Sequence, residues 1–178
     1  MIDIKIIKTT DSTYYNFVED LLVDAFPQEE RRELDIQREF TDSNPLFKSN
    51  VILHFDKPVG LFTYWDFDDF YYIEHFAISQ DARNGGFGKR VLEGMNEILE
   101  KPIVLEVEAP NDEMSKRRIG FYSRLGYELW EREYLQPPYR KGDGFLPMFL
   151  MVKGDLDSNK DFPCIKDKIY KEVYLVEA

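Results

Sequence analysis

Six consecutive residues have the types and the spacing needed to hold a phosphate group: Arg83-Asn84-Gly85-Gly86-Phe87-Gly88. They follow an apolar segment typical of a strand and precede a segment with helical periodicity. Glycine lacks a Cβ atom and tolerates positive φ, so its backbone can approach an anion closely. The free N–H groups and the dipole at the start of a helix favour negative charge there. The pattern predicts a phosphate-binding turn, although such a turn is also a common structural element.

Two common phosphate-binding motifs do not fit this turn. A P-loop requires Ser or Thr after Gly-Lys, but Arg90 follows Lys89. A dinucleotide fingerprint requires a third glycine where Val91 stands. The remaining pattern, Arg-x-x-Gly-x-Gly, resembles the signature of the GNAT family of N-acetyltransferases. The resemblance implies that the pyrophosphate of acetyl-CoA is bound by Arg83, Asn84, Gly85, Gly86, Phe87, Gly88 and Lys89.

A second motif lies downstream, where Phe121-Tyr122 is followed three residues later by Gly126-Tyr127. This stretch is similar to the aromatic-tyrosine and glycine-aromatic pattern of GNAT proteins. The resemblance implies that Tyr122 contacts the cofactor and acts as the general acid, and that Asn111 also contacts CoA. Phe121 and Leu125 form an i, i+4 apolar stripe, so Tyr122 is not obviously on the buried face. Taken alone, Tyr122 would be an ordinary surface or core tyrosine, but with both motifs at the expected separation the acid role is favoured.

The expected strand before the turn carries one acidic residue, Glu74, within an apolar run. Such a residue is usually exposed, paired or functional. Strand alternation predicts that four side chains share one face: Tyr72, Glu74, Phe76 and Ile78. The resemblance implies that this strand splays from its neighbour, and that Glu74 serves as a base or as an anchor for the amine. It also implies that pantetheine binds the backbone of Phe76, Ala77 and Ile78.

The reaction implied by the resemblance is transfer of an acetyl group from acetyl-CoA to a primary amine in a ternary complex. An amine of pKa about 10.4 must lose a proton, and the oxyanion needs N–H donors, expected around Phe76. A tyrosine of pKa about 10 can protonate a thiolate of pKa about 8.5 at small cost. The remote Cys164 is an improbable nucleophile, and His54 and His75 lack the spacing of metal ligands. A catalytically silent CoA-binding module and transfer of a longer acyl group remain open.

Charge and composition narrow the class of partner. The chain of 178 residues has a net charge of −11, which argues against nucleic acid. Acidic residues cluster in 11–42 and at Asp66, Asp68 and Asp69, a pattern more typical of a solvated acidic face. The alternative is that these charges attract a cationic acceptor, an amine of a small molecule or peptide. With one cysteine, no signal-peptide pattern and no long apolar run, the sequence predicts a cytoplasmic protein without a membrane span. Dimers are common in the family, so a homodimer is consistent with the resemblance.

The expected elements follow the GNAT order, which implies an α/β fold with a mixed, mostly antiparallel central sheet flanked by helices. The GNAT domain is expected over residues 1–153, and residues 154–178 are expected to add a helix that packs on it. Expected strands are 2–8, 50–55, 59–67, 71–79, 103–108, 127–135 and 145–152. Expected helices are 11–26, 28–40, 86–100, 112–125 and about 165–173.

Overall fold

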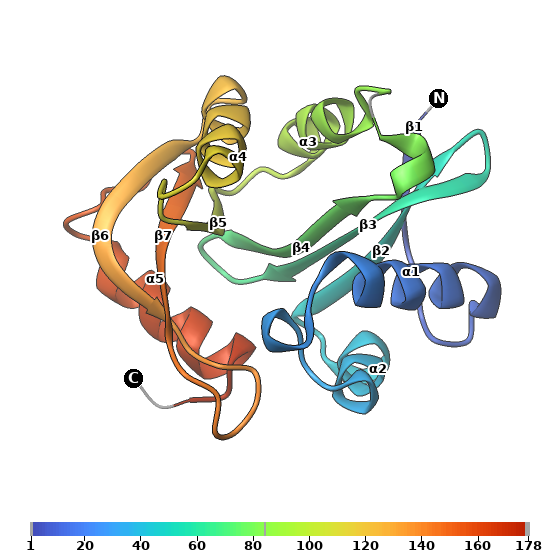
Figure 1. Ribbon diagram of the computed structural model, residues 1–178, viewed down its shortest axis with the longest axis horizontal. Coiled ribbons are helices and arrows are strands. Elements are labelled where there is room, and N and C mark those ends of the chain that lie inside the picture. Colours follow the sequence, from blue (N-terminus) through green and yellow to red (C-terminus); the bar gives the residue numbers. More distant parts are fainter. Residues whose placement is uncertain (1, 84, 177–178) are drawn as a thin grey trace. The chain divides into compact units, whose positions relative to one another are not determined.

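A computed structural model describes residues 2–83 and 85–176 of the chain (Figure 1). The chain divides into two compact units, Met1–Glu100 and Lys101–Ala178, and each is described by itself. In the described part of the chain, no helix is long and apolar enough to cross a membrane.

The first unit is a four-stranded antiparallel arrangement with helices on both faces. Its strands lie in the order β1-β2-β3-β4, with α3 on one side and α1 and α2 on the other (Figure 1). Helix α1 buries Val18 and Leu22 against Val51 and Leu61 of the strands. The elements are β1 (Ile2–Ile6), α1 (Ser12–Ala25), η1 (Gln28–Glu30), α2 (Leu34–Ser43), β2 (Phe47–His54), β3 (Lys57–Asp66), β4 (Tyr71–Ile78), η2 (Gln80–Ala82) and α3 (Phe87–Ile98).

The single helix predicted for residues 28–40 is wrong, because the structure has two shorter pieces, η1 and α2, in this region. Between them the chain is extended, with φ −148° and ψ 154° at Arg31. Arg32 is only 3% exposed, although a charged helix on the surface would leave it in solvent. Burial of this arginine against the strands explains the break.

Strand β4 contains a β-bulge at Glu74. Thr63 of β3 is opposite His75, and the next residue, Tyr64, is opposite Ile73, so Glu74 is the extra residue. The bulge resets the alternation of side chains. Glu74 and the adjacent His75 therefore lie on one face, where they contact Trp65 and Thr63 respectively.

The prediction that four side chains of β4 share one face, namely Tyr72, Glu74, Phe76 and Ile78, is consequently wrong. Phe76 is opposite Phe62, with ring centroids 5.8 Å apart, and lies on the face away from α1. Ile78 follows it on the same face, whereas Ala77 packs in the cluster under α1. A regular alternation cannot anticipate the extra residue that separates Glu74 from Phe76.

The second unit has three antiparallel strands in the order β5-β7-β6. Helix α4 begins with Asp112 as its N-cap, whose Oδ1 accepts from the backbone N–H of Ser115 at 2.8 Å. Its elements are β5 (Ile103–Glu108), α4 (Glu113–Arg124), β6 (Glu128–Gln136), β7 (Leu146–Lys153), α5 (Phe162–Lys168) and a π-helical turn η3 (Ile169–Val173).

The C-terminal helix predicted from the apolar spacing is present and packs within the second unit. The ring of Tyr134 on β6 lies 6.4 Å from Phe162 and 5.8 Å from Tyr170, centroid to centroid. The Tyr170 hydroxyl donates to the carbonyl of Leu135. These contacts make α5 and η3 part of the core of this unit.

Candidate active site

The glycine turn lies between the end of β4 and the start of α3, as the sequence predicts. Gly86 is the N-cap of α3 with φ +68°, a conformation that favours glycine. At Gly85 a Cβ atom would lie only 2.5 Å from the ring of Phe87. Arg90 stabilises the turn through two contacts. Its guanidinium donates a hydrogen bond to the Gly85 carbonyl at 3.1 Å, and its Cζ atom lies 4.8 Å from the centroid of the Phe87 ring.

The turn has the features that a pyrophosphate requires. A Cβ built on Gly86 would meet no atom within 4 Å, so the backbone there is open to approach. The first N–H groups of α3 have no partner within the helix and carry the positive end of its dipole. Arg83, whose Nε donates to the carbonyl of Ile78 at 3.2 Å, supplies a guanidinium beside the turn. Asn84 lies outside the described residues, and phosphate binding by these residues stays a prediction.

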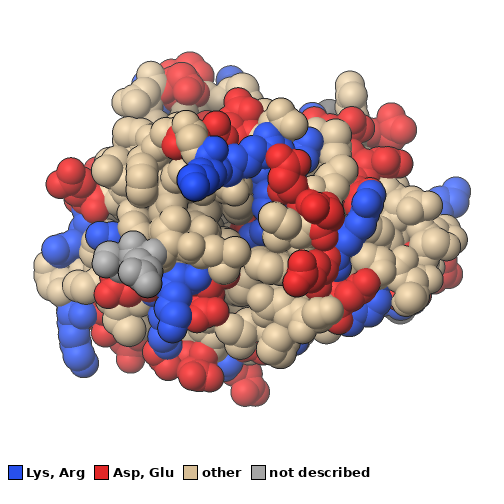
Figure 2. Space-filling view, turned by 90° about the horizontal axis from the view of Figure 1, so that it is seen from below, with Lys and Arg blue, Asp and Glu red and all other residues tan. Residues whose placement is uncertain are grey.

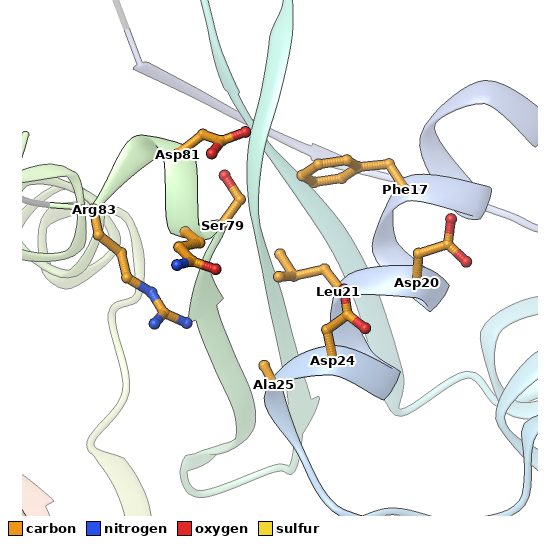
Figure 3. Close-up of a pocket in the computed structure, with 9 residues that line it drawn as sticks. Phe17, Asp20, Leu21, Asp24, Ala25, Ser79, Asp81 and Arg83 are labelled. Atoms are coloured by element: carbon orange, nitrogen blue, oxygen red, sulfur yellow. The ribbon is translucent and has the colours of Figure 1, made fainter.

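A pocket of about 610 Å³ lies beside the turn, between α1 and the segment that follows β4 (Figure 3). On the α1 side it is acidic, with Asp20 and Asp24 among the lining residues. Arg83 and Asp81 lie on the other side. The full lining is Phe17, Asp20, Leu21, Asp24, Ala25, Ser79, Gln80, Asp81 and Arg83. The α1 wall thus favours a cationic group, and the guanidinium favours an anionic one.

The other predicted acidic cluster lies elsewhere. Asp66, Asp68 and Asp69 stand at the connection between β3 and β4, at the opposite end of β4 from the glycine turn. On the face seen in Figure 2, acidic and basic side chains are interspersed among uncharged ones. The pocket carboxylates, and not this cluster, are therefore the acidic groups near the turn.

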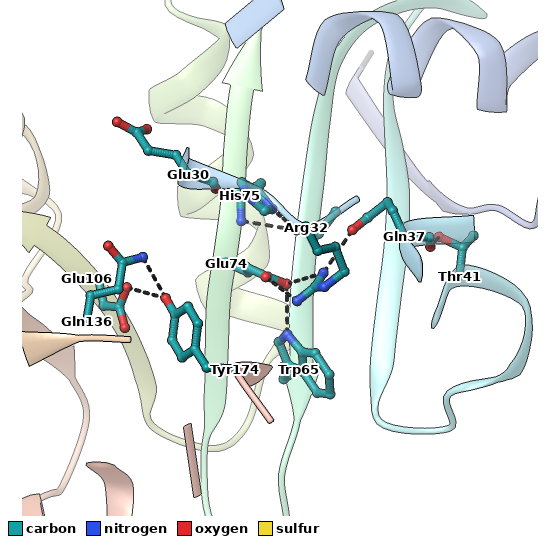
Figure 4. A network of polar contacts seen from close by, with 11 residues as sticks. Glu30, Arg32, Gln37, Thr41, Trp65, Glu74, His75, Glu106, Gln136 and Tyr174 are labelled. Carbon is teal, nitrogen blue, oxygen red and sulfur yellow. Dashed lines mark hydrogen bonds and ion pairs between the residues drawn. The ribbon is translucent and has the colours of Figure 1, made fainter. Parts of the chain in front are cut away.

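The side chain of Glu74 is fully buried and forms an ion pair with Arg32 (Figure 4). Arg32 donates to its carboxylate through two nitrogens, at 2.5 and 3.2 Å, and Trp65 Nε1 donates at 2.9 Å. Burial alone would raise the pKa of Glu74, but the Arg32 guanidinium more than offsets it, so the pKa is lowered. A general base at neutral pH needs a raised pKa. This geometry argues for a positioning role, and catalysis by Glu74 stays a prediction.

Arg32 lies in a cage of three aromatic rings. Its Cζ atom is 4.9 Å from the centroid of Phe40, 5.4 Å from that of Phe47 and 5.8 Å from that of Trp65. Arg32 also donates a hydrogen bond to Oε1 of Gln37, at 2.8 Å. Stacking and hydrogen bonds together hold the planar guanidinium in one orientation.

His75 is a buried structural histidine. Its Nε2–H donates to the carbonyl of Glu30 at 3.0 Å, and its backbone N–H donates to the Thr63 hydroxyl. Burial lowers the pKa of His75, although Glu74 and the Glu30 carbonyl oppose the shift. Within residues 2–83 and 85–176, no three His, Cys, Asp or Glu side chains gather in a way that could hold a metal ion.

Tyr122, the predicted general acid, belongs to the second unit. Its ring contacts Tyr127, with centroids 5.5 Å apart, and burial raises its pKa to about 12 despite the nearby Arg118. The phenol is therefore protonated at neutral pH. Transfer of its proton to a thiolate of pKa about 8.5 is uphill by roughly 5 kcal/mol. This cost is larger than for a tyrosine with the ordinary pKa of about 10. Asn111 is exposed just after β5.

Sequence reasoning assigned no role to Glu106, a half-buried acid on β5. Its carboxylate accepts from the hydroxyls of Tyr134 and Tyr174, the latter at 2.7 Å, and Gln136 donates to Tyr174 at 2.7 Å (Figure 4). The available signal was the one that drew attention to Glu74, namely an acid inside an apolar strand. The partners come from distant segments, so no spacing rule could find them.

Comparison with known proteins identifies the class as acyltransferases of the GNAT fold. The model of the acetyltransferase (GNAT) family matches residues 14–127, and the chain belongs to this family. A GNAT-family protein from Bacteroides thetaiotaomicron is similar, with 54% identity, a TM-score of 0.96 and coverage of 98% of this chain and 99% of that one. No match was found among curated proteins.

Two more distant structures share the fold alone. One is the ribosomal-protein-S18-alanine N-acetyltransferase from Escherichia coli, with 22% identity, a TM-score of 0.60 and coverage of 86% and 93% of the two chains. The other is a Bacillus subtilis acetyltransferase in complex with CoA, with 16% identity, a TM-score of 0.58 and coverage of 88% and 100%. The predicted family and α/β fold are thereby confirmed.

Proposed function

We propose that this protein transfers an acetyl group from acetyl-CoA to a primary amine of a small molecule or peptide. The observation that best supports this proposal is the glycine turn at the start of α3, where Gly86 has a positive φ. Arg83 lies beside this turn and lines an adjacent pocket of about 610 Å³. Membership of the acetyltransferase family supports acyl transfer. The amine substrate and the direct, ternary-complex mechanism are parts of this proposal.

On the donor side, the proposal assigns the pyrophosphate to the turn and the pantetheine arm to β4. The bulge at Glu74 does not reach these residues, because 75–78 pair regularly with β3. The proposal therefore uses the backbone groups of Phe76, Ala77 and Ile78 that point to the other edge of β4. The N–H groups near Phe76 would then stabilise the oxyanion as the N–C bond forms and the C–S bond breaks. The backbone of Ala77 and Ile78 would orient the thioester.

On the acceptor side, the proposal favours a cationic amine. Asp20 and Asp24 give one wall of the pocket two carboxylates, which attract a substrate with a further positive charge. The reacting nitrogen must itself be neutral, so one proton leaves it before attack and another as the amide forms. The departing thiolate takes its proton from Tyr122, which later regains one from solvent.

Two residues are candidates for the general base that takes the proton from the amine. Glu74 is the residue that the family resemblance implies, but its carboxylate is held by Arg32. Glu106, which accepts from two phenols, is another acid inside an apolar strand. The pH dependence of kcat/KM separates them, since loss of the true base abolishes the acidic limb of the profile.

Calorimetric titration with acetyl-CoA tests the proposal first, with Gly86→Glu as the control. We expect the wild type to bind and the variant, which places a bulky anion on the turn, to lose binding. Thiol release is then measured with a panel of mono-, di- and polyamines. Binding without turnover on any amine would instead support a silent CoA-binding module, and no binding by the wild type would refute the proposal.

A further inference from the structure

The connection between α1 and α2, residues 26–33, is fastened to β4 by two neighbouring side chains. Glu74 holds the guanidinium of Arg32, and His75 donates to the backbone carbonyl of Glu30 at 3.0 Å. The ring of Phe26 adds an edge contact, with its centroid 4.6 Å from that of His75. Three points along the connection are therefore held by two consecutive residues of one strand.

This attachment depends on the bulge. In a regular strand consecutive side chains point to opposite faces, so Glu74 and His75 could not both reach the connection. The extra residue in β4 places both on the same face. The irregular backbone of β4 and the position of residues 26–33 are consequently linked.

The attachment is also strong compared with other ion pairs nearby. The side chains of Arg32 and Glu74 are 4% and 0% exposed, so removing either partner would leave a buried charge unpaired. Arg38 and Glu19 form a similar two-nitrogen contact between α2 and α1, but Arg38 is half exposed. Solvent screens that second pair, which joins α2 to α1.

The fastened segments lead directly into the two walls of the pocket. Helix α1 ends at Ala25, immediately before the connection, and its last turns carry Asp20, Leu21 and Asp24. The opposite wall, residues 79–83, begins immediately after β4 ends at Ile78. A shift of residues 26–33 along β4 would therefore move one wall of the pocket relative to the other.

We propose that Arg32 is a positioning residue that sets the width of this pocket by fixing the connection between α1 and α2 to the bulge of β4. Arg32 is not among the residues that line the pocket. The choice of CoA as the ligand measured rests on the proposed function, which places CoA at the adjoining glycine turn. Arg83 belongs both to that turn and to the pocket lining, so CoA affinity reports on this wall. The geometry of the attachment itself does not depend on that assignment.

The test compares Arg32→Lys and Arg32→Met with Arg38→Lys and Arg38→Met. Lysine at position 32 keeps the charge but loses the two-pronged contact and the stacking. CoA affinity is measured by calorimetry at a temperature where circular dichroism shows each variant to be fully folded. Hydrogen exchange of backbone amides in 26–33 and 79–83 is measured without ligand.

For both Arg32 variants we expect faster exchange in 26–33 and 79–83, and CoA binding weaker by about tenfold, equivalent to about 1.4 kcal/mol. Both Arg38 variants should match the wild type within about twofold, below roughly 0.5 kcal/mol. If Arg32→Met does not fold, Arg32→Lys carries the same test. A merely stabilising role would lower the melting temperature but leave the CoA affinity of the folded protein unchanged.

Unchanged exchange in 79–83, or unchanged CoA affinity in folded Arg32 variants, would overturn the proposal. If the wild type binds no CoA, the proposed function fails, and the exchange comparison alone decides whether Arg32 holds the pocket walls. The two failures are thus distinguishable.

Discussion

Replacing Glu74 by glutamine should destabilise the protein strongly, because the change removes one charge and leaves the other buried. Glutamine has nearly the same shape, so packing is kept while the Arg32 guanidinium, 4% exposed, loses its counter-charge. Breaking a buried pair in this way costs about 3–5 kcal/mol. For a chain of 178 residues, each kcal/mol lowers the melting temperature by about 2–4 °C, so a decrease between about 6 and 20 °C is expected.

The pH dependence of this loss has a definite sign. The pKa of Glu74 is lowered from its ordinary value of 4.5 in the folded protein. Its contribution to stability is therefore fully present above that ordinary value and is lost as the pH falls through the lower, folded value. The difference between wild type and Glu74→Gln should be constant at neutral pH and should shrink in acid.

Thermal melts followed by circular dichroism at a series of pH values measure both effects. Glu19→Gln is the matched control, since it breaks the ion pair with Arg38, whose side chain is half exposed, and should cost no more than about 1 kcal/mol. Equal decreases in melting temperature for the two variants would refute the reasoning. A difference that does not shrink at any acid pH at which both proteins still fold would refute the assigned cause.

Three further predictions concern the proposed site. Tyr122→Phe should reduce kcat by about 10²–10⁴ with CoA affinity kept, as measured by thiol release and calorimetry; equal turnover would exclude Tyr122 as the acid. Gly86→Ala should cost about 1–2 kcal/mol in a denaturant titration, because φ is +68° there, whereas Gly94→Ala should not. Asp20→Asn with Asp24→Asn should raise KM for a polyamine but not for a neutral amine in steady-state assays, and an equal rise for both would contradict a charge effect.

Local patterns predicted the glycine turn well, because its residues are consecutive and their conformations depend on their immediate neighbours. The strand before Gly86 and the helix after it follow from periodicity alone. The same holds for α4, where Asp112 caps the start and Gly126, with φ +88°, follows the end. These features need no knowledge of distant contacts.

Long-range contacts account for what the sequence could not show. Glu74 stood out as an acid in an apolar strand, but its partner Arg32 is 42 residues away. Burial of that arginine breaks the helix expected over 28–40, and the bulge reverses the expected faces of β4. No local rule specifies which of many arginines pairs with one buried carboxylate.

The contact between Glu106 and Tyr174 has a consequence for how the chain is made. The two residues are 68 positions apart in sequence. At a synthesis rate of about 5–20 residues per second, roughly 3 to 14 s separate their translation. During that interval the nascent chain contains β5 but not Tyr174, so the carboxylate of Glu106 lacks this hydrogen-bond partner. The second unit therefore closes late, and ribosome stalling within this interval should leave a nascent chain whose second half is sensitive to proteases.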